Sequence, residues 1–143
     1  DGRFELLALH MTLVLRRLAA APEAKDFAQE VFDAMFADLD RGLRELGTGD
    51  LGVGREVKRM ASAFYGRARA YERGLAGAED LDDALRRNLY GTATPSAAAI
   101  EAMRAWSEAA AASLAGQSVA ALMAGEVEFP MPAPRRKGDA DAE

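Results

Sequence analysis

The sequence predicts an all-α protein: a single-domain bundle of five or six antiparallel helices with a disordered C-terminal tail. Ala, Leu and Arg dominate the 143 residues and β-branched residues are few, a composition that favours helices over strands. Apolar residues recur every three or four positions in several segments, as on one face of a helix. Gly and Pro fall mainly between these segments, and a chain of this length forms one core.

The first predicted helix covers about residues 3–20 and is apolar around most of its circumference, which is typical of a buried central helix. Pro22 then stands near the start of the next helix, a position that proline favours. That helix, residues 23–46, has one apolar face, made of Phe27, Val31, Met35, Leu39 and Leu43. Four glycines within residues 47–54 predict a tight connection to a third helix over 55–75.

A short helix is predicted to begin after Glu79 or Asp80, either of which can cap it, and to end near Leu89. Thr94 or Ser96 can cap the last long helix in the same way.

Gly116 is expected to bend the last long helix or to divide it, leaving a final piece that ends at Met123. We therefore place the helical domain at residues 1–124. The prolines at 130, 132 and 134, followed by basic and acidic residues, predict a disordered tail over residues 125–143.

Charge and cysteine content exclude several classes of function. The formal net charge of −5 argues against a DNA-binding protein, since these usually carry a positive excess. There is no cysteine, so disulfides and thiolate metal sites are excluded. No signal peptide is visible, and charged residues interrupt the most apolar segment, residues 4–18. We expect a cytoplasmic location, with peripheral attachment at the inner face of the membrane left open.

Nothing in the sequence predicts an enzyme, a cofactor or a small-molecule substrate. His10, the single histidine, is a conceivable haem ligand, but we favour a core or interface histidine with one hydrogen bond. Residues 49–54 faintly resemble a phosphate loop, yet no strand precedes them and the GxxxxGK[ST] pattern is missing. Paired acids such as Glu30/Asp33 lack the Glu-x-x-His element of a di-iron site. No metal site is therefore predicted.

The helix over 55–75 has two unlike faces when its residues are placed at 100° intervals. The apolar face consists of Val57, Met60, Ala61, Phe64, Ala68, Tyr71 and Leu75. The basic face consists of Arg55, Lys58, Arg59, Arg69 and Arg73. Like charges one turn apart destabilise an isolated helix by roughly 0.2–0.5 kcal/mol per pair, which indicates an anionic group opposite them.

Two explanations of the basic face stay open. The helix over 23–46 carries seven acids against three bases and can neutralise it from within the fold. Alternatively, the face contacts RNA phosphate, anionic lipid headgroups or an acidic segment of a client protein. Tyr65 and Arg67 flank the apolar stripe and can add stacking and hydrogen bonds.

Three groups of residues occur in an order and spacing that resemble the ubiquinol–cytochrome c chaperone family, the assembly factors of the cytochrome bc1 complex. The first comprises DGRFELL (1–7), LH (9–10) and VLRRL (14–18). The second comprises FD (32–33), MF (35–36) and DLD (38–40). The third comprises GVG (52–54), Lys58, Met60, FYGR (64–67), Tyr71 and RNLY (87–90). The resemblance runs over roughly residues 1–125.

The resemblance implies an all-helical, non-catalytic chaperone, here of bacterial type, that binds newly made cytochrome b and assists maturation of the ubiquinol–cytochrome c reductase (bc1) complex. Mitochondrial members work with a small partner near the ribosomal tunnel exit, and the family core usually has further sequence before the segment that begins at Asp1. The implied partners are cytochrome b or another bc1 subunit, with the ribosome or an anionic membrane surface. We take the candidate contact residues to be Arg55, Lys58, Arg59, Arg69, Arg73, Tyr65, Arg67 and His10. The alternatives are a lipid or RNA adaptor without a dedicated client and a haem-binding bundle.

Overall fold

The computed structural model describes residues 2–134, which contain six α-helices and two short helical turns. They are α1 (Gly2–Ala19), η1 (Pro22–Ala24), α2 (Lys25–Glu45), α3 (Asp50–Leu75), α4 (Leu81–Leu85), η2 (Arg86–Tyr90), α5 (Ala97–Gly116) and α6 (Val119–Met123). The prediction of an all-α single domain is confirmed.

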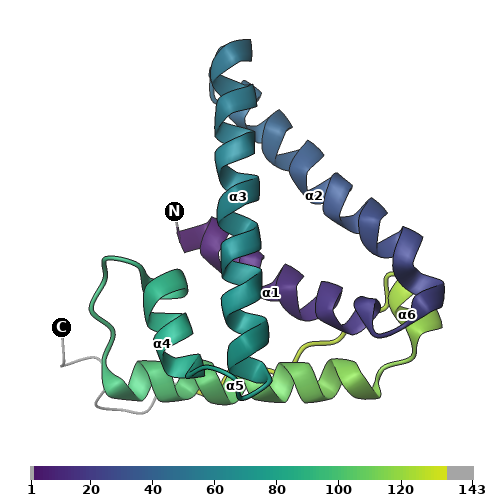
Figure 1. Cartoon of the computed structure of the whole chain (residues 1–143), viewed down its shortest axis with the longest axis vertical. Helices are drawn as coiled ribbons and strands as arrows, with labels where there is room; N and C mark the ends of the chain where they lie inside the picture. Colours follow the sequence, from purple (N-terminus) through teal and green to yellow (C-terminus); the bar gives the residue numbers. More distant parts are fainter. Residues whose placement is uncertain (1, 135–143) are drawn as a thin grey trace.

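The helices cross one another around α1. In Figure 1, α2 and α3 run antiparallel from a short connection and splay apart, with α1 passing between them. α5 runs across the base of α3, and α4 with the π-helical turn η2 fills the corner between them. The central position predicted for the first helix is confirmed.

Two apolar clusters hold these helices together. The larger surrounds α1 and takes Leu9 and Leu13 from it, Tyr71 from α3, Leu85 from α4 and Leu114 from α5. A smaller cluster joins α1, α2 and α3 and consists of Ala8, Met35 and Phe64, with further aromatic and aliphatic residues packed around it. The apolar faces predicted for residues 23–46 and 55–75 thus meet across α1.

The third helix begins earlier than the sequence suggested, at Asp50 instead of residue 55. Of the glycines in the connection, only Gly47 has a positive φ, 87°, so it alone makes the turn. Gly52 and Gly54 lie inside α3, which tolerates single glycines at a modest energetic cost. The consequence is a helical hairpin with a short connection, residues 46–49.

The predicted helix starts are confirmed by capping hydrogen bonds. The Asp80 carboxylate accepts a bond of 2.9 Å from the backbone N–H of Asp82, and the Ser96 hydroxyl accepts one of 3.1 Å from Ala99. α5 ends at Gly116 and α6 at Met123, so the last long helix is divided. Arg17 stabilises this division by donating to the carbonyls of Leu114 and Gln117 at 2.9 and 3.0 Å.

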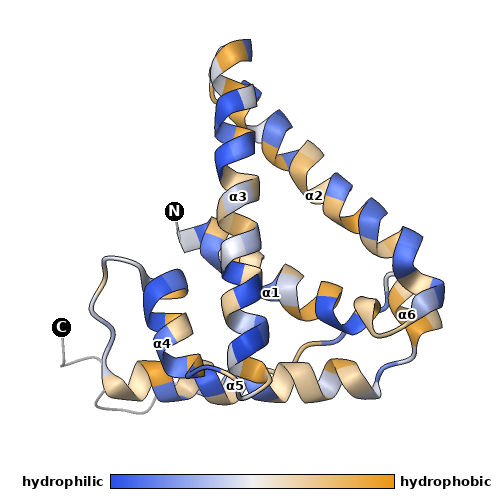
Figure 2. Ribbon diagram, viewed as in Figure 1, coloured by the Kyte–Doolittle hydropathy of each residue, from blue (hydrophilic) through white to orange (hydrophobic). Residues whose placement is uncertain are grey.

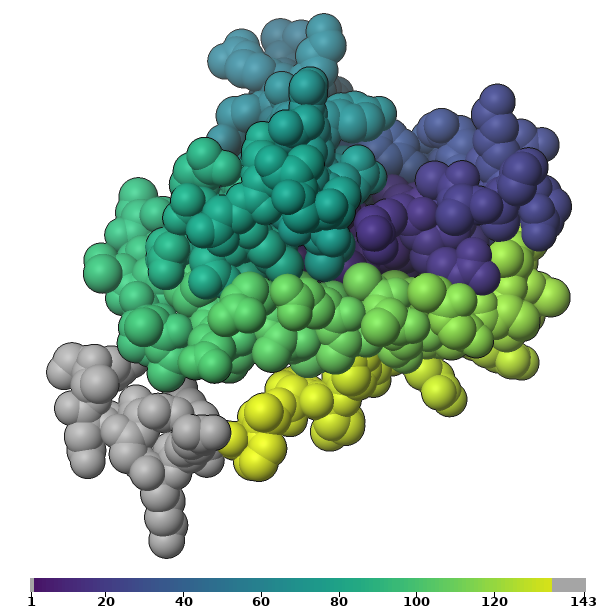
Figure 3. Space-filling model, turned by 60° about the horizontal axis from the view of Figure 1, so that its bottom comes forward, coloured from purple at the N-terminus to yellow at the C-terminus, as the bar shows by residue number. Residues whose placement is uncertain are grey.

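The first residues after Gly125 contact the helices. The Gln117 side chain bonds to both the N–H and the carbonyl of Glu128, and the Trp106 indole donates to the Pro130 carbonyl at 2.9 Å. Phe129 stacks on Trp106, with ring centroids 6.1 Å apart. Figure 3 shows this segment, in yellow, running along α5. The tail predicted for residues 135–143 lies outside the described residues.

Candidate functional site

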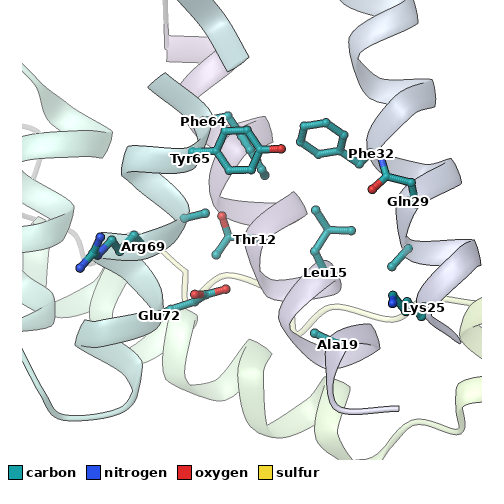
Figure 4. A pocket seen from close by; sticks show the side chains of 12 residues that line it. Thr12, Leu15, Ala19, Lys25, Gln29, Phe32, Phe64, Tyr65, Arg69 and Glu72 are labelled. Atoms are coloured by element: carbon teal, nitrogen blue, oxygen red, sulfur yellow. The ribbon is translucent and has the colours of Figure 1, made fainter. Parts of the chain in front are cut away.

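An open groove lies between α2 and α3, with α1 as its floor. Its volume is about 530 Å³, and its lining residues are Thr12, Leu15, Ala19, Lys25, Ala28, Gln29, Phe32, Phe64, Tyr65, Ala68, Arg69 and Glu72. Figure 4 shows Phe32 and Tyr65 facing each other across it from the two walls. Their ring centroids are 5.6 Å apart, and Tyr65 is 61% exposed.

The floor of the groove is apolar, and its rim is polar. Leu15 and Ala19 present aliphatic surface, while the Thr12 hydroxyl is satisfied by the Ala8 carbonyl of its own helix at 2.7 Å. Lys25 and Arg69 stand on opposite walls, as Figure 4 shows. The groove can therefore hold an apolar side chain or helix face while its rim contacts polar or acidic groups.

The groove exists because α2 and α3 diverge from their connection while α1 fills only the bottom of the space between them. Phe32 and Leu15 are half-buried, off the main apolar stripes of their helices. Sequence reasoning did not assign them to a site. The sequence feature that could have indicated a site is the wide apolar surface of α1 and α2. A helix that only packs against the core needs a narrower apolar stripe.

All five cations of the basic face are exposed. Two of them have acidic neighbours nearby in sequence: Arg59 pairs with Glu56, and Arg73 pairs with Glu79 at 2.6 Å. Hydrogen bonding within the first pair raises the pKa of Arg59 and lowers the pKa of Glu56. For Arg55, Lys58 and Arg69, residues 2–134 supply no ion pair.

Neutralisation of the basic face by the acidic helix α2 is not what the structure shows. Within the described part of the chain, no ion pair joins a cation of this face to α2. Two acids of α2 pair instead with arginines of their own helix: Asp38 with Arg41, and Asp40 with Arg44, which also pairs with Asp50. The basic face therefore remains open to solvent and to a partner.

Position along α3 divides the basic face into two groups. Arg55, Lys58 and Arg59 lie toward the connection with α2, whereas Arg69 and Arg73 lie near the other end. Arg69 lines the groove together with Tyr65. Arg69 follows Arg59 by ten positions, which is about 15 Å along a helix. The two groups are therefore separate clusters of positive charge along α3.

Arg67, in contrast, points into the fold. Its guanidinium bonds to both carboxylate oxygens of Glu5 on α1 and donates to the Ala63 carbonyl at 3.2 Å. It also lies 5.7 Å from the centre of the Phe4 ring, and its hydrogen bonds with Glu5 raise its pKa. The geometry gives Arg67 a role in joining α1 to α3, and contact with a partner stays a prediction that this geometry does not favour.

His10 lies in an aromatic cluster beside α5, away from the groove. Its ring centroid is 4.9 Å from that of Trp106 and 5.0 Å from that of Phe129. Its Nδ1 is 2.7 Å from the Leu6 carbonyl oxygen. This is the packed histidine with one hydrogen bond that we favoured from the sequence. Contact between His10 and a client stays a prediction.

No group of three or more metal-binding side chains occurs within residues 2–134. None of the helices in this part combines the length and the apolar character that crossing a bilayer requires.

Comparisons with known proteins agree with the fold and the sequence motifs. The profile of the ubiquinol–cytochrome C chaperone family matches residues 1–129. The crystal structure of the Cbp3 homolog from Brucella abortus superposes with a TM-score of 0.76 at 36% sequence identity, covering 90% of this chain and 72% of that one. No functionally curated protein matches the chain. The chain therefore belongs to the ubiquinol–cytochrome C chaperone family.

Proposed function

We propose that this protein is an assembly chaperone of the ubiquinol–cytochrome c reductase (bc1) complex and that its client is newly made cytochrome b. Membership of the chaperone family supports the general role. The observation that carries the finer proposal is the groove between α2 and α3, an apolar surface that the fold leaves open. A chaperone for a membrane protein needs such a surface, because its client exposes apolar helices before they are assembled.

The groove residues have distinct roles in this proposal. Leu15, Ala19 and Phe32 contact the apolar side of a client segment, and Tyr65 covers it from the opposite wall. Lys25 and Arg69 contact acidic groups or helix C-terminal carbonyls at the ends of the segment. An amphipathic client helix laid in a groove of this kind is a common recognition mode.

The proposal also includes where the protein works. The exposed cations of α3 support a peripheral position at an anionic surface, either the inner face of the membrane or the ribosome. A small partner protein, as in mitochondrial relatives, is compatible with the exposed surface. Either location keeps the chaperone close to a client that is being inserted.

Purification of the tagged protein from detergent-solubilised membranes tests the client. We expect cytochrome b to co-purify with the unmodified chain and with Met131→Ser, which alters an 88% exposed side chain away from the groove. Tyr65→Ser, at a 61% exposed position, should retain the fold and reduce recovery of cytochrome b. Equal recovery with Tyr65→Ser and Met131→Ser would contradict a role for the groove.

Deletion of the gene tests the pathway. We expect cytochrome b levels and bc1 activity to fall together, and the unmodified gene to restore both. Unchanged bc1 activity in the deletion strain would contradict the assembly role.

A further inference from the structure

The tip of the α2–α3 hairpin exposes two large apolar side chains. Leu46 is 84% exposed and Leu51 is 89% exposed, on either side of the turn at Gly47. In Figure 2 the end of α3 beside this connection is orange, with a blue stretch directly behind it. The tip projects from the molecule, away from α5 and α6 (Figure 1).

Leu51 shares a face of α3 with two cations that have no ion pair among the described residues. Arg55 and Lys58 follow it by four and seven positions, the spacing that places side chains in one row along a helix. The rise per residue puts their Cα atoms about 6 Å and 10 Å farther from the tip than that of Leu51. The order along the hairpin is therefore apolar tip first and cationic band second.

The layers of a lipid bilayer match this order, because the acyl chains lie deeper in the membrane than the phosphates. Its hydrocarbon core is about 30 Å thick, and about 40–45 Å including headgroups, so each headgroup layer is about 5–8 Å deep. A leucine placed in the acyl region would thus set Arg55 and Lys58 at the level of the phosphates. A fluid bilayer can accept a projecting pair of leucine side chains without a preformed pocket.

We propose that the α2–α3 tip inserts into anionic membranes, with Leu46 and Leu51 among the acyl chains and Arg55 and Lys58 on lipid phosphates. The inference deepens the proposed peripheral position at the membrane and rests on it. It is independent of the client. Two leucines alone bind membranes weakly, and a second, electrostatic signal makes the attachment stable.

Acidic groups near the tip determine the strength of this attachment. Asp50 is paired with Arg44, and Glu56 with Arg59. Glu45, beside Leu46, is exposed and has no ion pair within residues 2–134. It opposes binding to anionic lipid, so Glu45→Gln should increase binding.

Vesicle flotation with the purified full chain tests the proposal. The protein should float with phosphatidylcholine vesicles containing phosphatidylglycerol and much less with phosphatidylcholine alone. Arg55→Ser/Lys58→Ser should weaken binding about tenfold or more, and Leu46→Ser/Leu51→Ser should abolish it. Met131→Ser and Arg87→Ser, which remove an exposed apolar side chain and an exposed cation elsewhere, serve as matched controls and should bind normally. Binding that survives the double leucine change would overturn the proposal. Wild-type protein that does not float with anionic vesicles would overturn it as well, whether or not it sediments with ribosomes.

A single-site label tests insertion directly. The chain has no cysteine, so Leu51→Cys can carry an environment-sensitive fluorophore, with Met131→Cys as the control. Anionic vesicles should shift the emission of the label at residue 51 to the blue and leave that at residue 131 unchanged. No shift at residue 51 would overturn insertion. These assays contain no client, so their failure is distinct from a failure of cytochrome b to co-purify.

Discussion

Arg67 on α3 and Glu5 on α1 form a two-point ion pair, in which Arg67 Nη2 lies 2.7 Å from Glu5 Oε1 and Nε bonds to the other oxygen. The two side chains are 24% and 16% exposed, so the pair is largely withdrawn from water. The Arg67 guanidinium also lies over the Phe4 ring, 5.7 Å from its centre. This pair fixes the position of the groove floor relative to one wall.

We predict that Glu5→Gln lowers the free energy of unfolding by about 1–2 kcal/mol, because it leaves a partly buried guanidinium without its carboxylate. Arg67→Met, which keeps an unbranched side chain but removes the guanidinium, should cost a similar amount. The double variant should cost less than the sum of the two, as measured by urea denaturation in a double-mutant cycle. Strict additivity would show that the two side chains do not interact in solution.

Tyr71 tests the energetic effect of a buried hydroxyl that makes no hydrogen bond within residues 2–134. Its side chain is fully buried, and its hydroxyl has no hydrogen-bond partner among the described residues. We predict that Tyr71→Phe leaves the free energy of unfolding unchanged or raises it by up to about 1 kcal/mol, because no native bond is lost. A clear destabilisation in urea would indicate a bound water or another partner at the hydroxyl.

The same residue predicts a dependence on pH. Burial raises the pKa of Tyr71 above its ordinary value of 10. The contribution of Tyr71 to the free energy of unfolding is therefore fully present below pH 10. It is lost as the pH rises above 10, because the tyrosine of the unfolded chain ionises first. The loss is at most about 1.4 kcal/mol per pH unit. Tyr71→Phe should show a shallower decline above pH 10 than the wild type, whereas parallel curves would contradict the assignment.

Two glycines of α3 should respond oppositely to alanine. A Cβ on Gly66 would meet nothing within 4 Å, so Gly66→Ala should stabilise the helix by about 0.5–1 kcal/mol. A Cβ on Gly74 would lie 2.9 Å from Leu81 Cδ1 and 3.0 Å from its Cα, at the corner between α3 and α4. Gly74→Ala should therefore destabilise by about 1–3 kcal/mol. Thermal melts of both variants check the pair, and equal melting temperatures would contradict the close packing of this corner.

Tryptophan fluorescence can follow the packing of Phe129 against α5, because Trp106 is the single tryptophan of the chain. Phe129→Ala removes the ring that stacks on it and contacts His10. We predict a red shift of the emission and a loss of about 1–2 kcal/mol, since Phe129 is half-buried. Met131→Ser, at an exposed position of the same segment, should change neither quantity. An unchanged spectrum for Phe129→Ala would place the segment away from Trp106.

Much of the fold follows from local sequence signals. Asp80 and Ser96 are capping residues at predicted positions and act as caps, and the division at Gly116 appears where expected. The start of α3 was misplaced because Gly52 and Gly54 resemble turn residues, although only Gly47 has the backbone conformation that needs glycine. The bonds that Glu128 and Pro130 make with Gln117 and Trp106 could not be predicted, because a proline-rich composition carries no sign of such specific contacts.

The candidate site was only partly predictable. Helical spacing correctly placed the basic face on the exposed side of α3. It did not distinguish Arg67, because its partner Glu5 is 62 residues away in the sequence. The walls that α2 and α3 give the groove were not predicted either. The groove depends on how far α2 and α3 splay over α1, which is a property of tertiary packing that no single helix reveals.

Site-specific photo-crosslinking at residue 65 tests whether the client binds in the groove between α2 and α3. A photoreactive amino acid replaces Tyr65 in cells that assemble the bc1 complex, and a matched variant carries it in place of the exposed Met131. We expect a crosslink to cytochrome b from residue 65 and none from residue 131. Crosslinks from both positions, or from neither, would contradict the groove between α2 and α3 as the place where the client binds.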